Sequence, residues 1–595
     1  MVSDRAVFLH ALWTRPLVLV RHVPCLVAAV LLKIGNRLRS AVAPAHVGAK
    51  RRPYWIYKQT ANKTGLAVEG DRMVLPDLGI GSTSAAADGR MPASPGIAPG
   101  ADDAEARFER NRWRFLCEWL LGDRTDRQQS LGYVRSWIAQ NIDRNSEAWE
   151  PYSASERVAN LLVFLACDGR GNGAPPDSIR DLKLFVRESL DWIAGHLEYY
   201  GEHGTNNHIL NNARALVMGG VAVGDEQSVA TGIRTFREFL PRLITKDGFL
   251  RERSSHYQWI VANWVLDAWR FVDAGLGAHN PDVAFLQGHA MRMTAAATML
   301  ADDKGELLGL IGDISPDASP QLTARRLSLL YPDQFHACAR PRTGAARIAD
   351  DWFRLEGGCH TVLGNFPAGT FPPKYPTHGH ADHTGFVWRS GEVPVLVDSG
   401  RYRYTPDAVS VMQKSALGHS VALVNGFPPV CDSMLQNGLW WPWPYARAKL
   451  SLNNTDGSGV SMAHDGYARA TPVNRHVRKI EIAGDGIQVV DTFEGSGTVT
   501  IRQRWNFGPD FDAFDAQRSI VTGQDGAVHV SIAGFSADPE FRVFREDNSG
   551  GWYSDKYAAK AGSLTLVVQG ELALPVSIRT NFEMIHVWNS RNYPI

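Results

Sequence analysis

The run Thr377-His378-Gly379-His380-Ala381-Asp382-His383-Thr384-Gly385 carries more chemistry than any other stretch of this chain. It places three imidazoles and a carboxylate close together, which is more than packing alone requires. Histidine and aspartate side chains gathered in one loop are typical of a metal site, of proton transfer, or of both. The run is compatible with two enzyme classes of different architecture, so the segments around it are needed to distinguish them.

In the sequence before this run, apolar residues recur with the periodicity of helices. From Arg107 to about Tyr331, apolar residues recur three and four positions apart, which predicts helices with short connections. The windows are Trp113–Leu121, Val134–Ile142, Val158–Ala166, Leu182–Ile193, Ile209–Val217, Phe236–Ile244, Trp259–Phe271 and Met291–Leu300. Such a series predicts an α/α toroid or solenoid, although no clear sequence repeat accompanies it.

After about Ala349 the apolar period changes to two, which predicts strands. A strand is predicted around Trp388, and others at Val393–Val397, Val421–Val424, His476–Ile482, Ile487–Val490, Val499–Arg502, Val528–Ile532 and Leu564–Val568. Strands that follow helices predict separate domains. The expected fold is therefore a multidomain α+β protein: an N-terminal α/α toroid, as an incomplete barrel, followed by a C-terminal antiparallel β-sandwich.

Composition and period together predict four segments. Residues 76–104 are rich in Gly, Ser, Ala and Pro, which predicts a loop or linker. They follow an N-terminal helical or irregular extension at residues 1–75 and precede the toroid at 105–345 and the sandwich at 346–595. A chain of 595 residues is too long for one compact domain, which agrees with this division.

The charge balance bears on the class of partner. Lys plus Arg and Asp plus Glu both total 62, whereas a nucleic-acid binder normally has a clear basic excess, so no nucleic-acid partner is expected. The six cysteines are scattered and form no Cys-x-x-Cys pair, which indicates neither a zinc knuckle nor a disulfide scaffold.

The N-terminal apolar run Cys25–Leu32 is too short to span a membrane. Lys33, Arg37 and Arg39 lie between it and the candidate cleavage site Ala41–Ala43, where a signal peptide is normally uncharged. We therefore expect an amphipathic helix that either belongs to the fold or touches a membrane surface, with no transmembrane span.

One enzyme class with a His-x-His-x-Asp-His pattern is the metallo-β-lactamase-like hydrolases. There the pattern follows a buried strand near the start of an αββα fold. Here it follows Phe371-Pro-Pro-Lys-Tyr-Pro376, which cannot be a central strand because proline removes hydrogen-bond donors from the ladder. It also comes after more than half of the chain, so this interpretation is disfavoured.

Several motifs, in order along the chain, resemble the heparinase II/III-like polysaccharide lyase superfamily. They are Trp149-Glu150-Pro151-Tyr152-Ser153 with Glu156 and Arg157, Thr205-Asn206-Asn207-His208, Asp247-Gly248-Phe249, Glu252-Arg253-Ser254 with Tyr257, His378-Gly379-His380-Ala381-Asp382, Leu396-Val397-Asp398-Ser399-Gly400 and Gly418-His419-Ser420. The resemblance covers about residues 107–595 and is weakest in the last third. It implies a toroid packed on a sandwich, with a cleft for an anionic polysaccharide between them.

The resemblance also implies β-elimination at a uronic acid, by a bacterial carbon–oxygen lyase. This reaction needs a neutralised C5 carboxylate, a base for the C5 proton and an acid for the leaving O4. Asn207 and His208, at a helix N-terminus, are implied to neutralise the carboxylate. Tyr257 and His378 are implied to transfer the protons, in an order that the sequence leaves open. A phenol that acts as a base needs a lowered pKa, and Arg253 or His378 is the expected source of positive charge.

The resemblance further implies substrate-binding and metal residues. Substrate binding falls to Trp149, Tyr152, Arg157, Glu252 and Arg253, by ring stacking and guanidinium pairing. A second aromatic cluster, either a cleft floor or a packed loop, comprises Trp440, Trp441, Trp443 and Tyr445. His380, Asp398 and His419 resemble zinc ligands, and the metal is expected to hold loops rather than perform chemistry. Asp382 and His383 are expected to support them, and no organic cofactor is expected.

Two other functional classes stay open. One is a non-catalytic glycan-binding or assembly protein on the same scaffold. The other is a hydrolase, either metal-dependent or a glycosidase with Glu150 and Glu252 as its carboxylate pair. Heparin-like, alginate-like and exopolysaccharide substrates, the oligomeric state, and endo or exo action also stay open. The resemblance indicates a periplasmic location, whereas the lack of a clean signal peptide indicates the cytoplasm and a role in the cell's own surface polysaccharide.

Overall fold

The computed structural model describes residues 73–76, 78, 104–120, 127–167, 176–200, 205–302, 305–338, 346–371, 377–430, 446–453, 459–524 and 526–585. The predicted N-terminal extension up to residue 72, most of the predicted linker and the aromatic cluster at 440–445 lie outside these residues. Among the described helices, none is long and apolar enough to cross a membrane.

Helices make up the first half of the described chain. They are α3 (Ala104–Glu109), α4 (Phe115–Leu120), α5 (Arg127–Gln140), α6 (Pro151–Cys167), α7 (Pro176–Gly195), α8 (His208–Val223), α9 (Glu226–Leu243), α10 (Ser255–Leu276), α11 (Pro281–Met299), α12 (Pro320–Leu330) and α13 (Pro332–Cys338). Several begin where the sequence offers a side-chain cap. The Ser254 side chain accepts from the N–H of Tyr257 at the start of α10, and Ser319 caps α12 just before Pro320.

The centre of the helical part is formed by α8 and α10, which are buried along most of their length. Apolar side chains on every face explain this, because a helix that is apolar all round belongs inside a core. The two helices pack against each other, and α6, α7, α9 and α11 surround them. The starts of α8 and α10, where Asn207 and Ser255 lie, face the second half of the molecule.

Strands dominate the second half. They are β1 (Arg347–Ala349), β2 (Trp352–Gly357), β3 (His360–Asn365), β4 (Gly369–Phe371), β5 (Val387–Ser390), β6 (Val393–Leu396), β7 (Ala422–Val424), β8 (Ala446–Leu452), β9 (Gly459–His464), β10 (Val473–Ala483), β11 (Gly486–Phe507), β12 (Phe511–Asp515), β13 (Ile520–Gly523), β14 (Ala527–Ala533), β15 (Glu540–Phe544), β16 (Trp552–Tyr553), β17 (Ala561–Gly562) and β18 (Leu564–Ile585). One helix, α14 (Ala408–Lys414), interrupts them.

The strands form a large antiparallel assembly. Its main path runs β1-β2-β3-β5-β6-β11-β10-β9-β8-β4, and β18 connects β11 to β14 and β15. The long strands β11 and β18 pair along nearly their whole length, with a shift of register between Phe493 and Gly497. A buried apolar core that includes Trp388, Trp505 and Phe582 lies among these strands. The fold predicted from the sequence, a helical toroid followed by an antiparallel β-sandwich, is confirmed.

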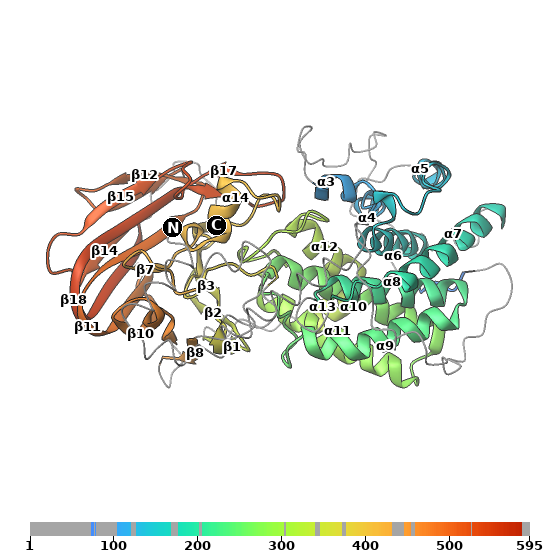
Figure 1. Cartoon of the computed structure of the whole chain (residues 1–595), viewed down its shortest axis with the longest axis horizontal. Coiled ribbons are helices and arrows are strands. Elements are labelled where there is room, and N and C mark those ends of the chain that lie inside the picture. The colour runs from blue at the N-terminus through green and yellow to red at the C-terminus, as the bar shows by residue number, and fades with distance from the viewer. Residues whose placement is uncertain are drawn as a thin grey trace, which may run out of the picture.

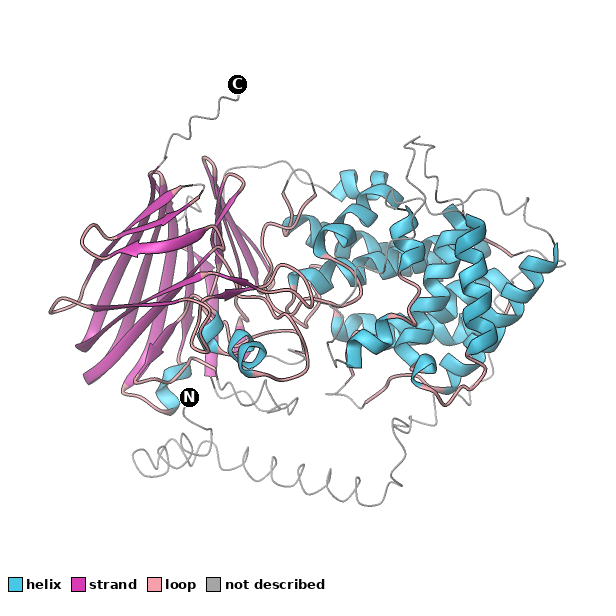
Figure 2. Ribbon diagram, turned by 90° about the horizontal axis from the view of Figure 1, so that it is seen from above, coloured by secondary structure: helices cyan, strands magenta, loops and turns pink. Residues whose placement is uncertain are grey.

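The half built of helices and the half built of strands lie side by side (Figures 1 and 2). An apolar cluster joins them: Phe249 of the helical half stacks on Trp352 of β2, with ring centroids 5.7 Å apart. The guanidinium of Arg354 in β2 donates to the carbonyls of Met299 and Ala301 at the end of α11. These contacts fix the cleft between the halves.

The segment between α11 and α12 runs along the contact between the two halves, and Gly312 marks its closest approach. Gly312 has φ +80°, a conformation that L side chains rarely adopt. A Cβ there would lie 2.6 Å from the carbonyl oxygen of Arg253 and 2.7 Å from that of His378. Glycine at this position therefore lets the connection pass between the two halves and sets the position of Asp313.

Candidate active site

A cleft of about 240 Å³ lies between the helical half and the loops of the strand half. Its wall is formed by Glu105, Arg112, Tyr152, Asn206, His208, Tyr257, Asp313, Pro316, Asp317, Thr377, His378, Arg401 and Tyr404. Of the four residues predicted to be catalytic, His208, Tyr257 and His378 line this wall, and Asn207 adjoins His208. The structure thus brings together residues from two helix starts and from the histidine-rich loop.

Asn207 precedes α8, as the sequence predicts, but its side chain makes no capping hydrogen bond. Both its Oδ1 and its Nδ2 are buried, and neither has a hydrogen-bond partner among the described residues. Its backbone N–H donates to Oε1 of Glu252 at 2.6 Å. A buried amide without a partner is costly, so this side chain is suited to receive a ligand.

His208 is held by a carboxylate that the sequence did not single out. Its Nδ1 lies 2.8 Å from Oε1 of Glu198, and Oε2 of Glu198 accepts from Asn212. Burial lowers the pKa of His208, but the charge and hydrogen bond of Glu198 outweigh burial and raise it to about 9. The His208 side chain is one-third exposed, so at neutral pH it presents an imidazolium to the cleft beside Asn207.

Tyr257, on the first turn of α10, has two aromatic neighbours from the strand half. Its ring stacks on that of His378, with centroids 3.6 Å apart and planes at 10°. Its Oη lies 2.6 Å from Oη of Tyr404, which in turn donates to the carbonyl of Ile314. Tyr404 was not predicted, because a lone tyrosine in a loop carries no sequence signal of its own.

The expected lowering of the Tyr257 pKa is wrong. Burial instead raises the pKa of Tyr257 well above its usual range, and no neighbouring cation reverses this. The Arg253 guanidinium instead donates to Asn365 and Asp382. Burial also lowers the pKa of His378 to about 4, although Asp313 acts in the opposite direction, so His378 is neutral at neutral pH.

His378 lies between two carboxylates. Its Nδ1 is 3.2 Å from Oδ2 of Asp313, and its Nε2 is 3.3 Å from Oε2 of Glu252. Burial raises the pKa of Glu252 to about 8, against the N–H of Asn207, which lowers it. Near neutral pH, Glu252 is therefore mostly protonated.

Asp313 is the most heavily engaged acid on the cleft wall. Besides His378, it contacts Nε2 of His380 at 2.9 Å, Nη1 of Arg401 at 3.2 Å and Nζ of Lys414 at 3.5 Å. Burial alone would raise the pKa of Asp313, but Lys414 and Arg401 hold it well below its usual range. The only signal in the sequence is an acid placed inside the otherwise apolar segment Leu307–Ile314 after Gly312.

Of the residues expected to bind substrate, some line the cleft and others do not. Tyr152 lines the cleft, and its Oη donates to Asp317 at 2.5 Å. Asp317 also forms an ion pair with Arg112, and Arg112 forms another with Glu105. The sequence did not predict these three residues of the cleft wall.

Trp149 and Arg157 do not reach the cleft wall, contrary to expectation. Arg157 is fully buried, lies 4.1 Å from the ring centroid of Trp137 and donates to the carbonyls of Asn111 and Ala148. Trp149 packs in the same aromatic core. Guanidinium stacking on indole rings explains why this motif belongs to the helical core.

Glu252 and Arg253 also lie behind the cleft wall rather than on it, because both are buried between the halves. Glu150, the other half of the proposed glycosidase pair, accepts backbone N–H bonds from Tyr152 and Ser153 at the start of α6. This carboxylate serves as a helix cap, an arrangement that does not suit a catalytic acid.

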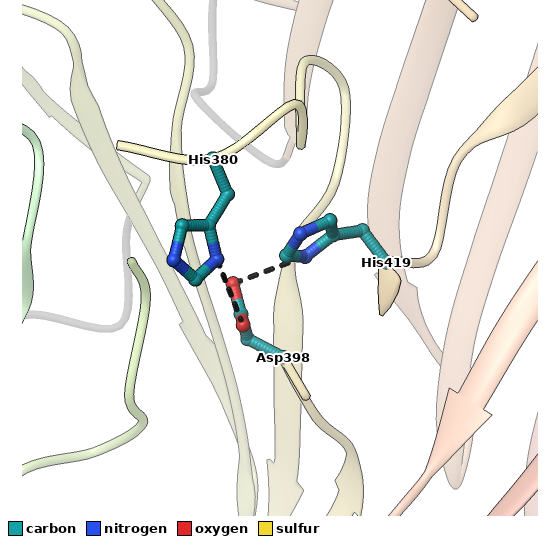
Figure 3. A group of neighbouring side chains, drawn as sticks. All are labelled: His380, Asp398 and His419. Carbon is teal, nitrogen blue, oxygen red and sulfur yellow. Dashed lines mark ion pairs between the residues drawn. The ribbon is translucent and has the colours of Figure 1, made fainter. Parts of the chain in front are cut away.

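His380, Asp398 and His419 converge in the strand half, next to the cleft (Figure 3). All three are buried. Nδ1 of His380 lies 3.8 Å from Oδ1 of Asp398, and Nδ1 of His419 lies 3.2 Å from Oδ2 of Asp398. Because Nε2 of His380 faces the Asp313 carboxylate, its Nδ1 is left with a lone pair that faces Asp398 without a hydrogen-bond partner. Two imidazoles and one carboxylate fit a zinc ion and leave a fourth position.

Two groups of known proteins are similar to this chain. Residues 341–583 match the family described as heparinase II/III-like, C-terminal. Among solved structures, a mutant of the heparan sulfate lyase HepC from Pedobacter heparinus has a TM-score of 0.56 at 15% identity, covering 83% of this chain and 80% of its own. A heparinase III has a TM-score of 0.60 at 13% identity, covering 81% and 77%. No curated protein sequence matches the chain.

At these identities the solved structures establish the shared fold, and the family match covers the strand half. Together they confirm the resemblance that the motifs indicate. The roles of the individual residues rest on the geometry described above.

Proposed function

We propose that this chain, whose residues 341–583 match the heparinase II/III-like C-terminal family, cleaves a uronic-acid-containing polysaccharide by β-elimination. The observation that carries this proposal is that groups able to neutralise a carboxylate and groups able to transfer protons lie together at one cleft. His208 offers an imidazolium for a carboxylate on the cleft wall, and the buried amide of Asn207 adjoins it. The stacked pair of Tyr257 and His378 lines the same wall.

The first step in the proposed reaction is binding of the C5 carboxylate by the Asn207 side chain and the His208 imidazolium. Their charge and hydrogen bonds stabilise the negative charge that develops when the C5 proton leaves. Asn207 is already desolvated and His208 is held in position by Glu198, so neither needs large reorganisation.

The protonation states favour one assignment of acid and base. The neutral His378, which lines the cleft, accepts the C5 proton, and the electron pair forms the double bond between C4 and C5. The bond from C4 to O4 breaks, and Oη of Tyr257 gives its proton to O4. The hydroxyl of Tyr404, at 2.6 Å, stabilises the resulting phenolate until protons are exchanged back.

A structural zinc ion belongs to the same proposal. His380, Asp398 and His419 would hold it, and it would supply the cross-link between three loops of the strand half. Every proton transfer proposed above uses side chains of this chain alone.

The test is ultraviolet absorbance during incubation with a panel of uronate polysaccharides that includes heparin-like and alginate-like members. Elimination creates a conjugated double bond and hydrolysis does not. We expect absorbance to rise with the wild-type chain, and Tyr257→Phe to reduce the rate by at least about 100-fold, the usual contribution of a general acid.

Tyr133→Phe is the matched control, because Tyr133 is 41% exposed on α5 and does not line the cleft. It should retain the wild-type rate. New reducing ends without absorbance would favour a hydrolase, and binding without any product would favour a glycan-binding protein.

A further inference from the structure

We propose that Asp313 is a positioning residue that fixes the ring tautomers of His378 and His380 together. One carboxylate would thereby join the candidate zinc site to the proton-transfer site. The role of the His378 tautomer in proton transfer rests on the proposed function, whereas the assignment of the two tautomers does not.

The two oxygens of Asp313 face different histidines. Oδ2 lies 3.2 Å from Nδ1 of His378, and Oδ1 lies 2.9 Å from Nε2 of His380. Arg401 and Lys414 also contact this carboxylate, so it is held as an anion. An ionised carboxylate only accepts hydrogen bonds, and each facing ring nitrogen must therefore carry a proton.

For His380 the consequence is a lone pair on Nδ1. That atom is buried, has no hydrogen-bond partner and lies 3.8 Å from Oδ1 of Asp398. Two buried acceptors that face each other are unfavourable unless a cation lies between them. A histidine ligand commonly donates its other N–H to a carboxylate, which is the role that Asp313 has here.

For His378 the consequence is a lone pair on Nε2. In the neutral ring, which lies flat against Tyr257, Nε2 is then the nitrogen that carries the lone pair. It is 3.3 Å from Oε2 of Glu252, the only carboxylate oxygen that the described contacts place beside it. The opposite tautomer would leave Asp313 facing a lone pair and would remove the proposed base.

Hydrogen bonds of its backbone fix the position of Asp313 relative to both rings. The N–H of Asp313 donates to the carbonyl of His378 at 2.8 Å, and its own carbonyl accepts from Oγ of Ser254 at 2.7 Å. The left-handed Gly312 precedes it. The carboxylate is therefore anchored to the histidine loop and to the start of α10.

The test is Asp313→Asn in the full chain. An amide has one acceptor atom and one donor group, so it cannot accept from both histidines on opposite sides. We expect the affinity for zinc, measured by competition with a chromogenic chelator, to fall about 10- to 100-fold. We also expect nitrogen-15 spectra of the histidine rings to show His378 protonated on Nδ1 in the wild type and a changed tautomer of His378 or His380 in the variant. Variants His378→Gln and His380→Gln assign the signals.

Asp267→Asn is the matched control. Asp267 is a fully buried acid that binds Arg214, Arg326 and Tyr331 inside the helical half. Its loss should lower the melting temperature while zinc affinity and the histidine spectra keep their wild-type values.

Wild-type spectra with His378 unprotonated on Nδ1 would overturn the proposal without any variant. Zinc affinity within twofold of wild type in Asp313→Asn, or an equal loss in Asp267→Asn, would also overturn it. None of these readouts needs a polysaccharide, so failure to form an unsaturated product counts against the proposed function alone.

Discussion

His208 shows how one neighbour sets the chemistry of a side chain. Glu198 stabilises the imidazolium, which raises the pKa of His208 to about 9 against an unfolded value of about 6.5. The pair therefore contributes its full stabilisation below about pH 6.5. That contribution is lost as the pH rises through about 9.

Glu198→Gln should remove this stabilisation and return the pKa of His208 towards its ordinary value. The fraction of imidazolium at pH 8 would then fall roughly 10- to 30-fold. We expect kcat/KM on a responsive uronate polymer to fall by a similar factor at pH 8 and much less at pH 6. Parallel pH profiles for the variant and the wild type would contradict a role for the charge of His208.

The connection between α11 and α12 depends on the backbone of Gly312. Gly312→Ala adds a Cβ that would meet two carbonyl oxygens at 2.6 and 2.7 Å, in addition to the cost of a positive φ. Gly277→Ala is the matched control, because Gly277 has φ +77° and nothing within 4 Å of the added Cβ.

We expect the control to lower the free energy of unfolding by about 1 kcal/mol and Gly312→Ala to lower it by at least about 2–3 kcal/mol more. Urea denaturation measures both. Gly312→Ala should also weaken zinc binding, because Asp313 follows directly. Equal losses for the two variants would show that the close approach is unimportant.

The local sequence pattern predicts two separate strands where the structure has one. The predicted strands at Ile487–Val490 and Val499–Arg502 are parts of the single strand β11, whose Gly495-Ser496-Gly497 has the composition of a turn. Pairing with β18 on both sides of the register shift keeps this segment within one strand. A partner strand more than 60 residues away overrides the local preference.

The molecule as a whole depends on the docking of its halves, since Tyr257 and His378 come from opposite sides of the cleft. Trp352 is 2% exposed at the joining surface and stacks on Phe249. Trp352→Ala should cost about 3–5 kcal/mol. We expect scanning calorimetry to show one unfolding transition for the wild type and two for the variant. A single transition at the wild-type temperature would contradict this coupling.

The amino-acid sequence was sufficient for the order of helices and strands, for the helix start at Asn207, and for the His-x-His loop. These features depend on period, capping and short motifs, which are local properties of the chain. The same local motifs identified His208, Tyr257 and His378, which the structure brings to one cleft.

Tertiary contacts alone placed Asp313, Glu198 and Tyr404 beside those residues and moved Arg157 into the core. They also reversed the expected shift in the pKa of Tyr257. The physical reason is that protonation state, tautomer and desolvation depend on every charge and dipole within a few ångströms. In this protein those neighbours come from elements that are far apart in the chain.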